Sequence, residues 1–268
     1  MLDFSALGLS EPPFSLSPDP RFFFLSAQHK TALAKITYTA EQRQGLSVVY
    51  GDVGVGKTTI ARRLYQIYND SLGFEAAYLP MPIFPSEFQF LKAICSEFGL
   101  PPKRSKYAQI ELLNTHLIDI WKQGKNAILI LDEAQALVGQ QFELIRQLLN
   151  FESNTQKLIQ VILIGQNELR NKLRLKKALR SRIATRSTIE PLDQHDTRDM
   201  IIFRVMVAGH MNPLFTDEAI QAIYDYSHGM PRDICALGLN VLPLALIRNV
   251  RVIDVDLVQQ AIHELGED

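Results

Sequence analysis

Residues 51–58 of this 268-residue sequence read GDVGVGKT, which is the complete G-x-x-x-x-G-K-T spacing of a phosphate-binding loop. Residues 46–50 before it are apolar and rich in β-branched side chains, as in a buried strand. Residues 59–69 after it have the composition of a helix. A strand, a glycine-rich loop and a helix in this order are the context in which the motif binds phosphate. A glycine-rich turn without a ligand is the alternative, and these flanking segments disfavour it.

The residue types of this loop suit a phosphorylated ligand. Its three glycines let the backbone curl so that N–H groups point at phosphate oxygens, and the start of the next helix adds partial positive charge. Lys57 is expected to reach the β- and γ-phosphates, and the Thr58 hydroxyl is expected to ligate Mg²⁺. The residues expected to contact the nucleotide here are Gly51, Asp52, Val53, Gly54, Val55, Gly56, Lys57, Thr58 and Thr59.

The composition is that of an ordinary soluble globular protein, with 47% apolar and 21% charged residues. The formal net charge of −1 gives no overall attraction to nucleic acid or anionic lipid. Cys95 and Cys235 lie far apart, which predicts buried thiols in a reducing cytosol and not a disulfide framework or metal site. No signal peptide opens the sequence, and the longest apolar run, residues 236–247, is too short to cross a bilayer. We therefore expect a cytoplasmic protein without membrane insertion.

The order of predicted elements indicates an α/β protein followed by helices. Strand-like runs are expected at residues 46–50, 74–79, 127–131 and 159–164. Helices are expected at residues 27–44, 59–69, 86–98, 107–123 and 140–151. This alternation predicts a parallel sheet covered on both faces, whose ligands bind at the carboxyl ends of the strands.

Beyond about residue 193 the strand pattern stops. Four further helices are expected at residues 197–208, 216–227, 232–247 and 254–265, with starts at Thr216 and Asp254 and a kink or break near Pro243. We expect three parts: an N-terminal arm and helix packed on the core (residues 1–44), an α/β core (residues 45–190) and a helical domain (residues 191–268). The arm is proline- and phenylalanine-rich and must be packed to bury residues 22–24.

Two acids, Asp132 and Glu133, follow the apolar strand at residues 127–131. Adjacent buried carboxylates are costly unless a cation or a reaction uses them. Asp132 is expected to hold Mg²⁺ and its hydration shell, and Glu133 to polarise the water that attacks the γ-phosphate. A strand that runs out into a solvated acidic turn is the alternative. Gln166 follows another strand, and its amide is expected to contact the γ-phosphate or that water, although an ordinary loop role stays open.

Eight basic residues and no acid occur in residues 170–186. Phosphoryl transfer gains from a guanidinium that neutralises developing charge, often supplied in trans. We expect Arg182 to be this arginine finger, with Arg180 and Arg186 as alternatives, and interpret most of the other cations as a solvated basic helix.

The order of these motifs resembles that of AAA+ ATPases, specifically the ExeA/GspA group and its relatives, the TnsC/TniB-type transposition regulators. The matching residues are Phe4 to Leu9, Pro12 to Phe14, Pro18 to Phe22, His29 with Ala32 and Leu33, residues 51–58, Asp132 to Gln135, Leu163 to Gln166 with Glu168 and Leu169, and Gly229 to Arg232. The resemblance runs nearly end to end, and its N-terminal block is more diagnostic than the phosphate loop. Residues 195–197 read HDT where relatives usually have Glu-Thr, a departure without expected consequence.

This resemblance implies an αβα core with a helical lid, ATP bound between them, and subunits in a ring where Arg182 of one faces the nucleotide of the next. It assigns Gln166 and Arg232 to the two sensor positions. A plain turn with proline at a helix start is the alternative for Arg232.

Secretion-type members of the group carry a membrane segment and a peptidoglycan-binding region after the ATPase, and this sequence reaches Asp268 without either. The expected function is therefore a transposition regulator that forms an ATP-dependent ring or helical filament on double-stranded DNA and recruits a transposase or target-selection protein. Lys103, Arg104 and Lys106 are expected to contact DNA phosphates, with a solvated loop as the alternative. A cytoplasmic ATPase for secretion or pilus assembly, acting on protein partners, is the alternative function. A nucleotide switch with little turnover is a third.

Overall fold

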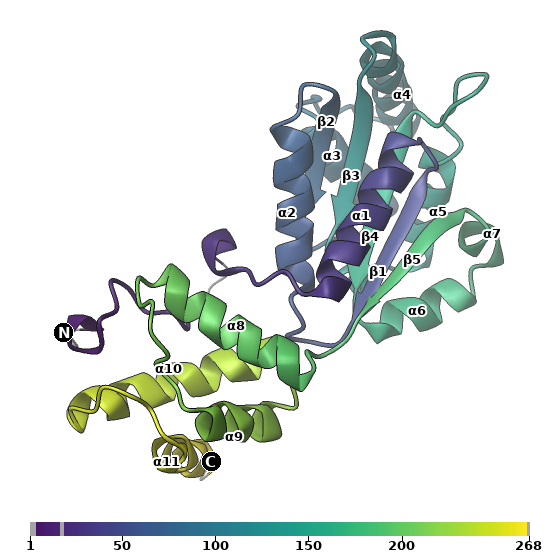
Figure 1. The fold of residues 1–268 in the computed structure, drawn as a ribbon. Helices are drawn as coiled ribbons and strands as arrows, with labels where there is room; N and C mark the ends of the chain where they lie inside the picture. The colour runs from purple at the N-terminus through teal and green to yellow at the C-terminus, as the bar shows by residue number, and fades with distance from the viewer. Residues whose placement is uncertain (1–3, 17–18, 267–268) are drawn as a thin grey trace. The chain divides into compact units, whose positions relative to one another are not determined.

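The computed structural model describes residues 4–16 and 19–266, and Pro18 of the N-terminal motif lies outside them. Its sheet is parallel, with the strand order β2-β3-β4-β1-β5 (Figure 1). The strands are β1 (Leu46–Gly51), β2 (Phe74–Leu79), β3 (Asn126–Leu131), β4 (Ile159–Gly165) and β5 (Ile183–Ile189). The four predicted strands and the parallel sheet are confirmed.

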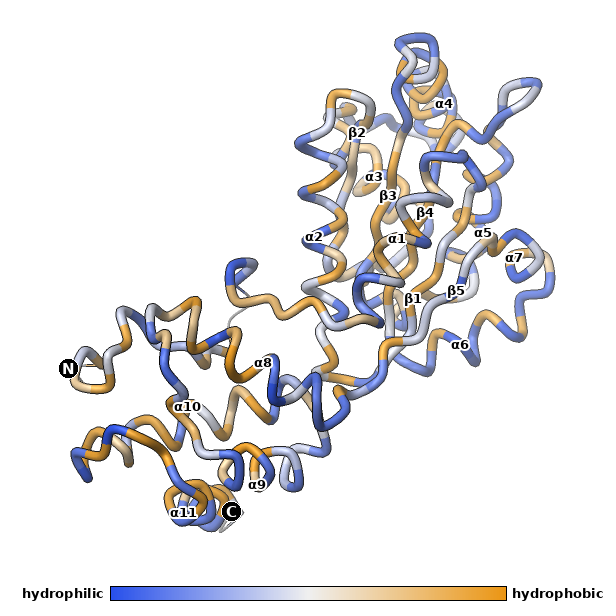
Figure 2. Tube along the Cα trace, in the orientation of Figure 1, coloured by the Kyte–Doolittle hydropathy of each residue, from blue (hydrophilic) through white to orange (hydrophobic). Residues whose placement is uncertain are grey.

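The inner strands are apolar because helices cover both faces of the sheet. Every residue of β1, β3 and β4 is buried, which is typical of central strands in parallel sheets. Figure 2 shows the apolar colour along β3. The seven helices of this part are α1 (Ala27–Glu41), α2 (Lys57–Asn69), α3 (Glu87–Glu97), α4 (Lys106–Lys122), α5 (Gly139–Leu148), α6 (Asn167–Arg174) and α7 (Lys177–Arg180), with the short 3-10 helix η3 (Ala134–Ala136) after β3.

Strand β5 was not predicted, and the interpretation of residues 170–186 as a basic helix is wrong for residues 183–186. This strand pairs only with β1, at the edge of the sheet, and buries alternate residues instead of a continuous run. Ile183, Ser187 and Ile189 are buried, whereas Arg186 between them is exposed. The basic residues made this segment resemble a solvated helix. Its β-branched isoleucines and threonines were the feature that favoured a strand.

The C-terminal region is helical, as predicted. It comprises α8 (Gln194–Val207), α9 (Asp217–Ser227), α10 (Pro231–Ile247) and α11 (Val255–Leu265). Thr216 and Asp254 cap α9 and α11 by accepting backbone N–H groups, which confirms both predicted starts. Of the kink or break expected near Pro243, the break is wrong, because α10 continues to Ile247. Buried Val241, Leu242 and Ala245 pack in the core of this region and hold the helix together across the proline.

The chain divides into two compact units, each with its own apolar core. The α/β unit contains residues 27–53 and 60–189, and the helical unit contains residues 1–26, 54–59 and 190–268. The expected first part, residues 1–44, is thus split after Ser26. Helix α1 groups with the sheet, whereas the arm groups with the C-terminal helices.

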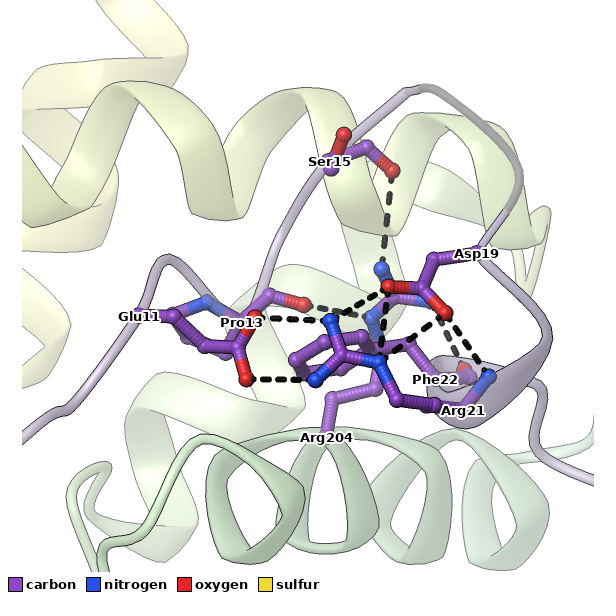
Figure 3. A network of polar contacts seen from close by, with 7 residues as sticks. All are labelled: Glu11, Pro13, Ser15, Asp19, Arg21, Phe22 and Arg204. Atoms are coloured by element: carbon purple, nitrogen blue, oxygen red, sulfur yellow. Dashed lines mark hydrogen bonds and ion pairs between the residues drawn. The ribbon is translucent and has the colours of Figure 1, made fainter.

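Arg204 of α8 explains why the arm belongs to the helical unit (Figure 3). Its guanidinium is buried and donates hydrogen bonds to three arm carbonyls: Pro13 at 2.7 Å, Phe22 at 3.0 Å and Ser15 at 3.5 Å. Burial lowers the pKa of Arg204, while the Asp19 carboxylate acts in the opposite direction. A buried cation of this kind is stable only because carbonyl oxygens replace its water.

Phe14 adds an apolar anchor for the same arm. Its ring is 1% exposed and meets Phe215 edge-on, with 5.9 Å between ring centroids. A Cβ on Gly238 of α10 would lie 2.5 Å from the Phe14 ring, so only glycine admits the ring there. On the surface, Arg21 pairs with Glu11 at 2.9 Å and with Asp19 at 2.7 Å.

We predict that Arg204→Met lowers the free energy of unfolding by about 3 kcal/mol, because three backbone carbonyls lose charge-assisted hydrogen bonds while the apolar stem is kept. The measurement is urea denaturation followed by circular dichroism. Chymotrypsin should also cut the variant faster at residues 22–24. Arg198→Met is the matched control on α8; it breaks only an exposed ion pair with Asp217 and should cost less than about 1 kcal/mol. Equal effects of the two changes would contradict the role of Arg204.

Candidate functional site

The sheet order places the carboxyl ends of β3, β4 and β1 next to one another. Asp132 and Glu133 follow β3, Gln166 follows β4, and Asp52 follows β1. This edge is where ligands bind to open parallel sheets. The predicted acids and the predicted amide therefore lie on neighbouring strand ends, within one unit of the protein.

The phosphate loop has the predicted strand–loop–helix context, since β1 ends at Gly51 and α2 begins at Lys57. Gly54 and Gly56 have φ angles of 91° and 95°, which favour glycine. Lys57 is 5% exposed and stands at the start of α2, where backbone N–H groups have no partner within the helix. This start of a 13-residue helix is suited to an anion.

Arg232 lies next to the loop, within the helical unit that includes residues 54–59. A Cβ on Gly54 would be 2.9 Å from Cβ of Arg232 and 3.3 Å from the Met230 side chain. Arg232 is itself exposed, one residue after the proline that begins α10. The glycine at position 54 thus permits a close approach of the start of α10.

Asp132 is 1% exposed and its Oδ1 accepts the Glu133 backbone N–H at 2.9 Å. Tyr78 of β2 lies near it: burial, reinforced by the Asp132 charge, raises the pKa of the tyrosine hydroxyl to about 12. Glu133 has a φ of 51°, a left-handed conformation that is costly for a side chain with Cβ. Strain of this kind concentrates at functional sites.

Two predicted residues, Glu133 and Gln166, meet directly. Gln166 Nε2 donates to Glu133 Oε2 at 3.4 Å. Sequence reasoning missed two further side chains at this edge. Gln135 bonds to both of these residues, and Asn167 Nδ2 donates to Asp52 Oδ1 at 2.6 Å. Gln135 was noted only as part of the family motif, and nothing in its spacing indicated a contact across to β4.

The three candidate finger residues have different surroundings. Arg182 donates to Asn150 Oδ1 and, at 3.5 Å, to the Arg146 carbonyl, so its guanidinium lies at the end of α5. Arg186 donates to the Arg180 carbonyl at 3.1 Å. Arg180 and Arg186 are exposed, and Arg182 is half-buried. The choice among the three remains a prediction.

Of the two residues predicted to ligate Mg²⁺, Thr58 lies in the first turn of α2, and Asp132 follows β3. No group of three or more His, Cys, Asp and Glu side chains in the described residues forms a metal site. Mg²⁺ does not need a complete set of protein ligands, because one or two protein ligands and the substrate phosphates usually hold it. A buried carboxylate with hard oxygen donors at the end of β3 fits this ion.

The basic cluster at residues 103–106 is partly neutralised. Lys106 Nζ pairs with Glu87 Oε2 at 2.8 Å, and Lys103 and Arg104 are exposed before the start of α4. Across the part of the chain that the structure describes, no helix combines the length and apolarity needed to cross a membrane.

A family model described as an AAA domain matches residues 40–173, half of the chain. The chain belongs to the AAA+ family. It is 39% identical over 229 residues to general secretion pathway protein A of Aeromonas hydrophila, which places it in the ExeA/GspA group. The alignment covers 84% of this chain, and the chain spans 41% of the length of that relative.

Solved structures share the fold of this AAA+ chain. The ORC2 protein of Aeropyrum pernix, with ADPNP and ADP, superimposes with a TM-score of 0.69 at 17% identity, covering 91% of this chain and 69% of that chain. Drosophila ORC bound to DNA gives a TM-score of 0.68 at 18% identity, covering 98% and 65%. At these identities the likeness concerns the fold, and it confirms the predicted α/β class with a helical region.

We predict that Gly165→Ala destabilises the AAA+ core by about 2 kcal/mol through overpacking. A Cβ there would lie 2.7 Å from Gln135 Oε1, 3.0 Å from Leu169 Cδ2 and 3.1 Å from the Gln135 backbone nitrogen. Urea denaturation measures the change. Gly139→Ala is the control, because its Cβ would meet only the Lys176 ammonium at 3.5 Å. A Gly165 variant as stable as this control would contradict the close approach at the end of β4.

Proposed function

We propose that this chain binds ATP, hydrolyses it, oligomerises with ATP and acts on protein partners of a secretion or pilus-assembly system. The observation that carries the proposal is the strand-end edge: Glu133 and Gln166 are in contact there, next to the strand that continues into the phosphate loop. The family match supports the choice of a nucleotide as ligand.

In the proposed reaction, Lys57 and the N–H groups of residues 51–59 bind the triphosphate and offset its charge. Glu133 orients and polarises the attacking water, and Gln166 hydrogen-bonds the γ-phosphate or that water. Arg182, or else Arg180 or Arg186, enters the site of a neighbouring subunit, and Arg232 contacts the nucleotide from the lid. Thr58 and Asp132 would hold Mg²⁺, which neutralises phosphate charge when bound.

The choice of protein partners follows the identity to general secretion pathway protein A. This similarity favours a secretion or pilus-assembly role over DNA transposition. One observation favours transposition as the second candidate: Lys103 and Arg104 remain exposed cations beside a helix start. The Lys106–Glu87 pair weakens that candidate, because an acid within the cluster repels phosphate.

We predict that Lys57→Ala abolishes retention of labelled ATP with magnesium, because a buried ammonium opposite the phosphates is lost. Lys35→Ala, at an exposed position of α1, should bind normally. Equilibrium dialysis or filter binding measures this. Retention by Lys57→Ala equal to that of Lys35→Ala would refute the nucleotide site.

We predict that Glu133→Gln keeps ATP affinity and lowers kcat by about 100-fold or more, since the base is lost but the phosphate contacts remain. The variant should also trap the ATP-bound oligomer, which size-exclusion chromatography with light scattering detects. Unchanged turnover in this variant would refute the assigned role of Glu133.

A third test separates the two biological roles. With a non-hydrolysable ATP analogue at low salt, we predict no shift of duplex DNA in a gel assay. If a shift occurs and Lys103→Ala/Arg104→Ala/Lys106→Ala removes it, the transposition candidate replaces the secretion candidate. The salt dependence of such binding should then be steep.

A further inference from the structure

Gln135 uses both ends of its side-chain amide at the candidate site. Nε2 donates to Glu133 Oε2, and Oε1 accepts the Gln166 backbone N–H at 3.0 Å. The orientation of the amide follows from these partners. A backbone N–H only donates and an ionised carboxylate only accepts, so Oε1 must face Gln166 and Nε2 must face Glu133.

The backbone around Gln135 is held as firmly as its side chain. Lys172 of α6 donates to the carbonyls of Gln135 and, at 3.1 Å, of Leu137. Gly165 at the end of β4 has no side chain, and a Cβ there would lie 2.7 Å from Gln135 Oε1. The short helix η3 is thus fixed against the end of β4 from two sides.

These contacts constrain the carboxylate of Glu133. Glu133 Oε2 accepts hydrogen bonds from the side-chain amides of Gln135 and Gln166, the latter at 3.4 Å. Glu133 Oε1 makes no hydrogen bond with the described residues. One oxygen is therefore held in place and the other can accept a proton from water.

The same contacts continue toward the phosphate loop. Gln166 is followed by Asn167, whose amide donates to Asp52 Oδ1 at 2.6 Å. All four side chains, Glu133, Gln135, Asn167 and Asp52, belong to the α/β unit. These hydrogen bonds, together with the peptide bond between Gln166 and Asn167, thus join the ends of β3, β4 and β1.

We propose that Gln135 is the positioning residue of Glu133: it orients the carboxylate for water activation and ties it, through Gln166 and Asn167, to the first turn of the phosphate loop. The proposal rests on the ATP hydrolysis proposed above. Gln135 acts through Glu133 and does not contact substrate. Second-layer hydrogen bonds of this kind are typically worth about 10- to 100-fold in activity.

Two substitutions test it. Gln135→Met keeps the length of the side chain and removes both hydrogen bonds; we expect kcat to fall about 10- to 100-fold while the Kd for a fluorescent ATP analogue stays within about twofold. Gln135→Glu keeps the acceptor for the Gln166 N–H but places a carboxylate against Glu133. One of two adjacent carboxylates retains a proton to higher pH. We therefore expect the acidic limb of the kcat profile to move up by about one pH unit or more, with activity recovering at alkaline pH.

Gln140→Met and Gln140→Glu are the matched controls, because Gln140 is exposed on α5. A merely structural role for Gln135 would lower the melting temperature and kcat without moving the pH profile, and that result would overturn the proposal. Wild-type kcat in Gln135→Met, with the wild-type enzyme active, would also overturn it and leave the proposed function intact. A wild-type protein that binds ATP without hydrolysing it would overturn both.

Discussion

The parallel pairing of β4 with β3 on one side and β1 on the other is the constraint on which the candidate site depends. Parallel strands end at the same edge, so three connections separated by long stretches of sequence begin side by side. Their first residues are polar, and they satisfy one another through side-chain amides and carboxylates. Since these polar groups border fully buried strands, leaving them unpaired would be costly.

A different interaction organises the helical unit. Arg204 replaces its water shell with the carbonyls of an arm nearly 200 positions earlier in the sequence, and Phe14 fills the space that Gly238 leaves. The arm is therefore part of the second core. In the described part of this arm, the Phe14 and Phe22 rings are buried, and backbone carbonyls supply the acceptors for Arg204.

The charges of the molecule bear on its partners. A net charge of −1 leaves recognition to local features, and the one cluster noted in the sequence for DNA contact includes a lysine paired with Glu87. Weak, compensated charge is compatible with protein partners, for which shape and apolar contact matter more than a phosphate-attracting field.

Short segments of the sequence are enough to predict several features: the strand–loop–helix at the phosphate loop, the acids after β3, four of the strands and the caps at Thr216 and Asp254. Each is encoded within about a dozen neighbouring residues, by hydrophobic periodicity or a motif. Four other features become visible only in the folded chain: β5 is an edge strand, α10 continues past Pro243, the arm groups with the helical unit, and Gln135 contacts Glu133 and Gln166. Those outcomes depend on groups far apart in the sequence, whose packing and hydrogen bonds override local propensity. A local sequence pattern does not show which distant groups will come into contact.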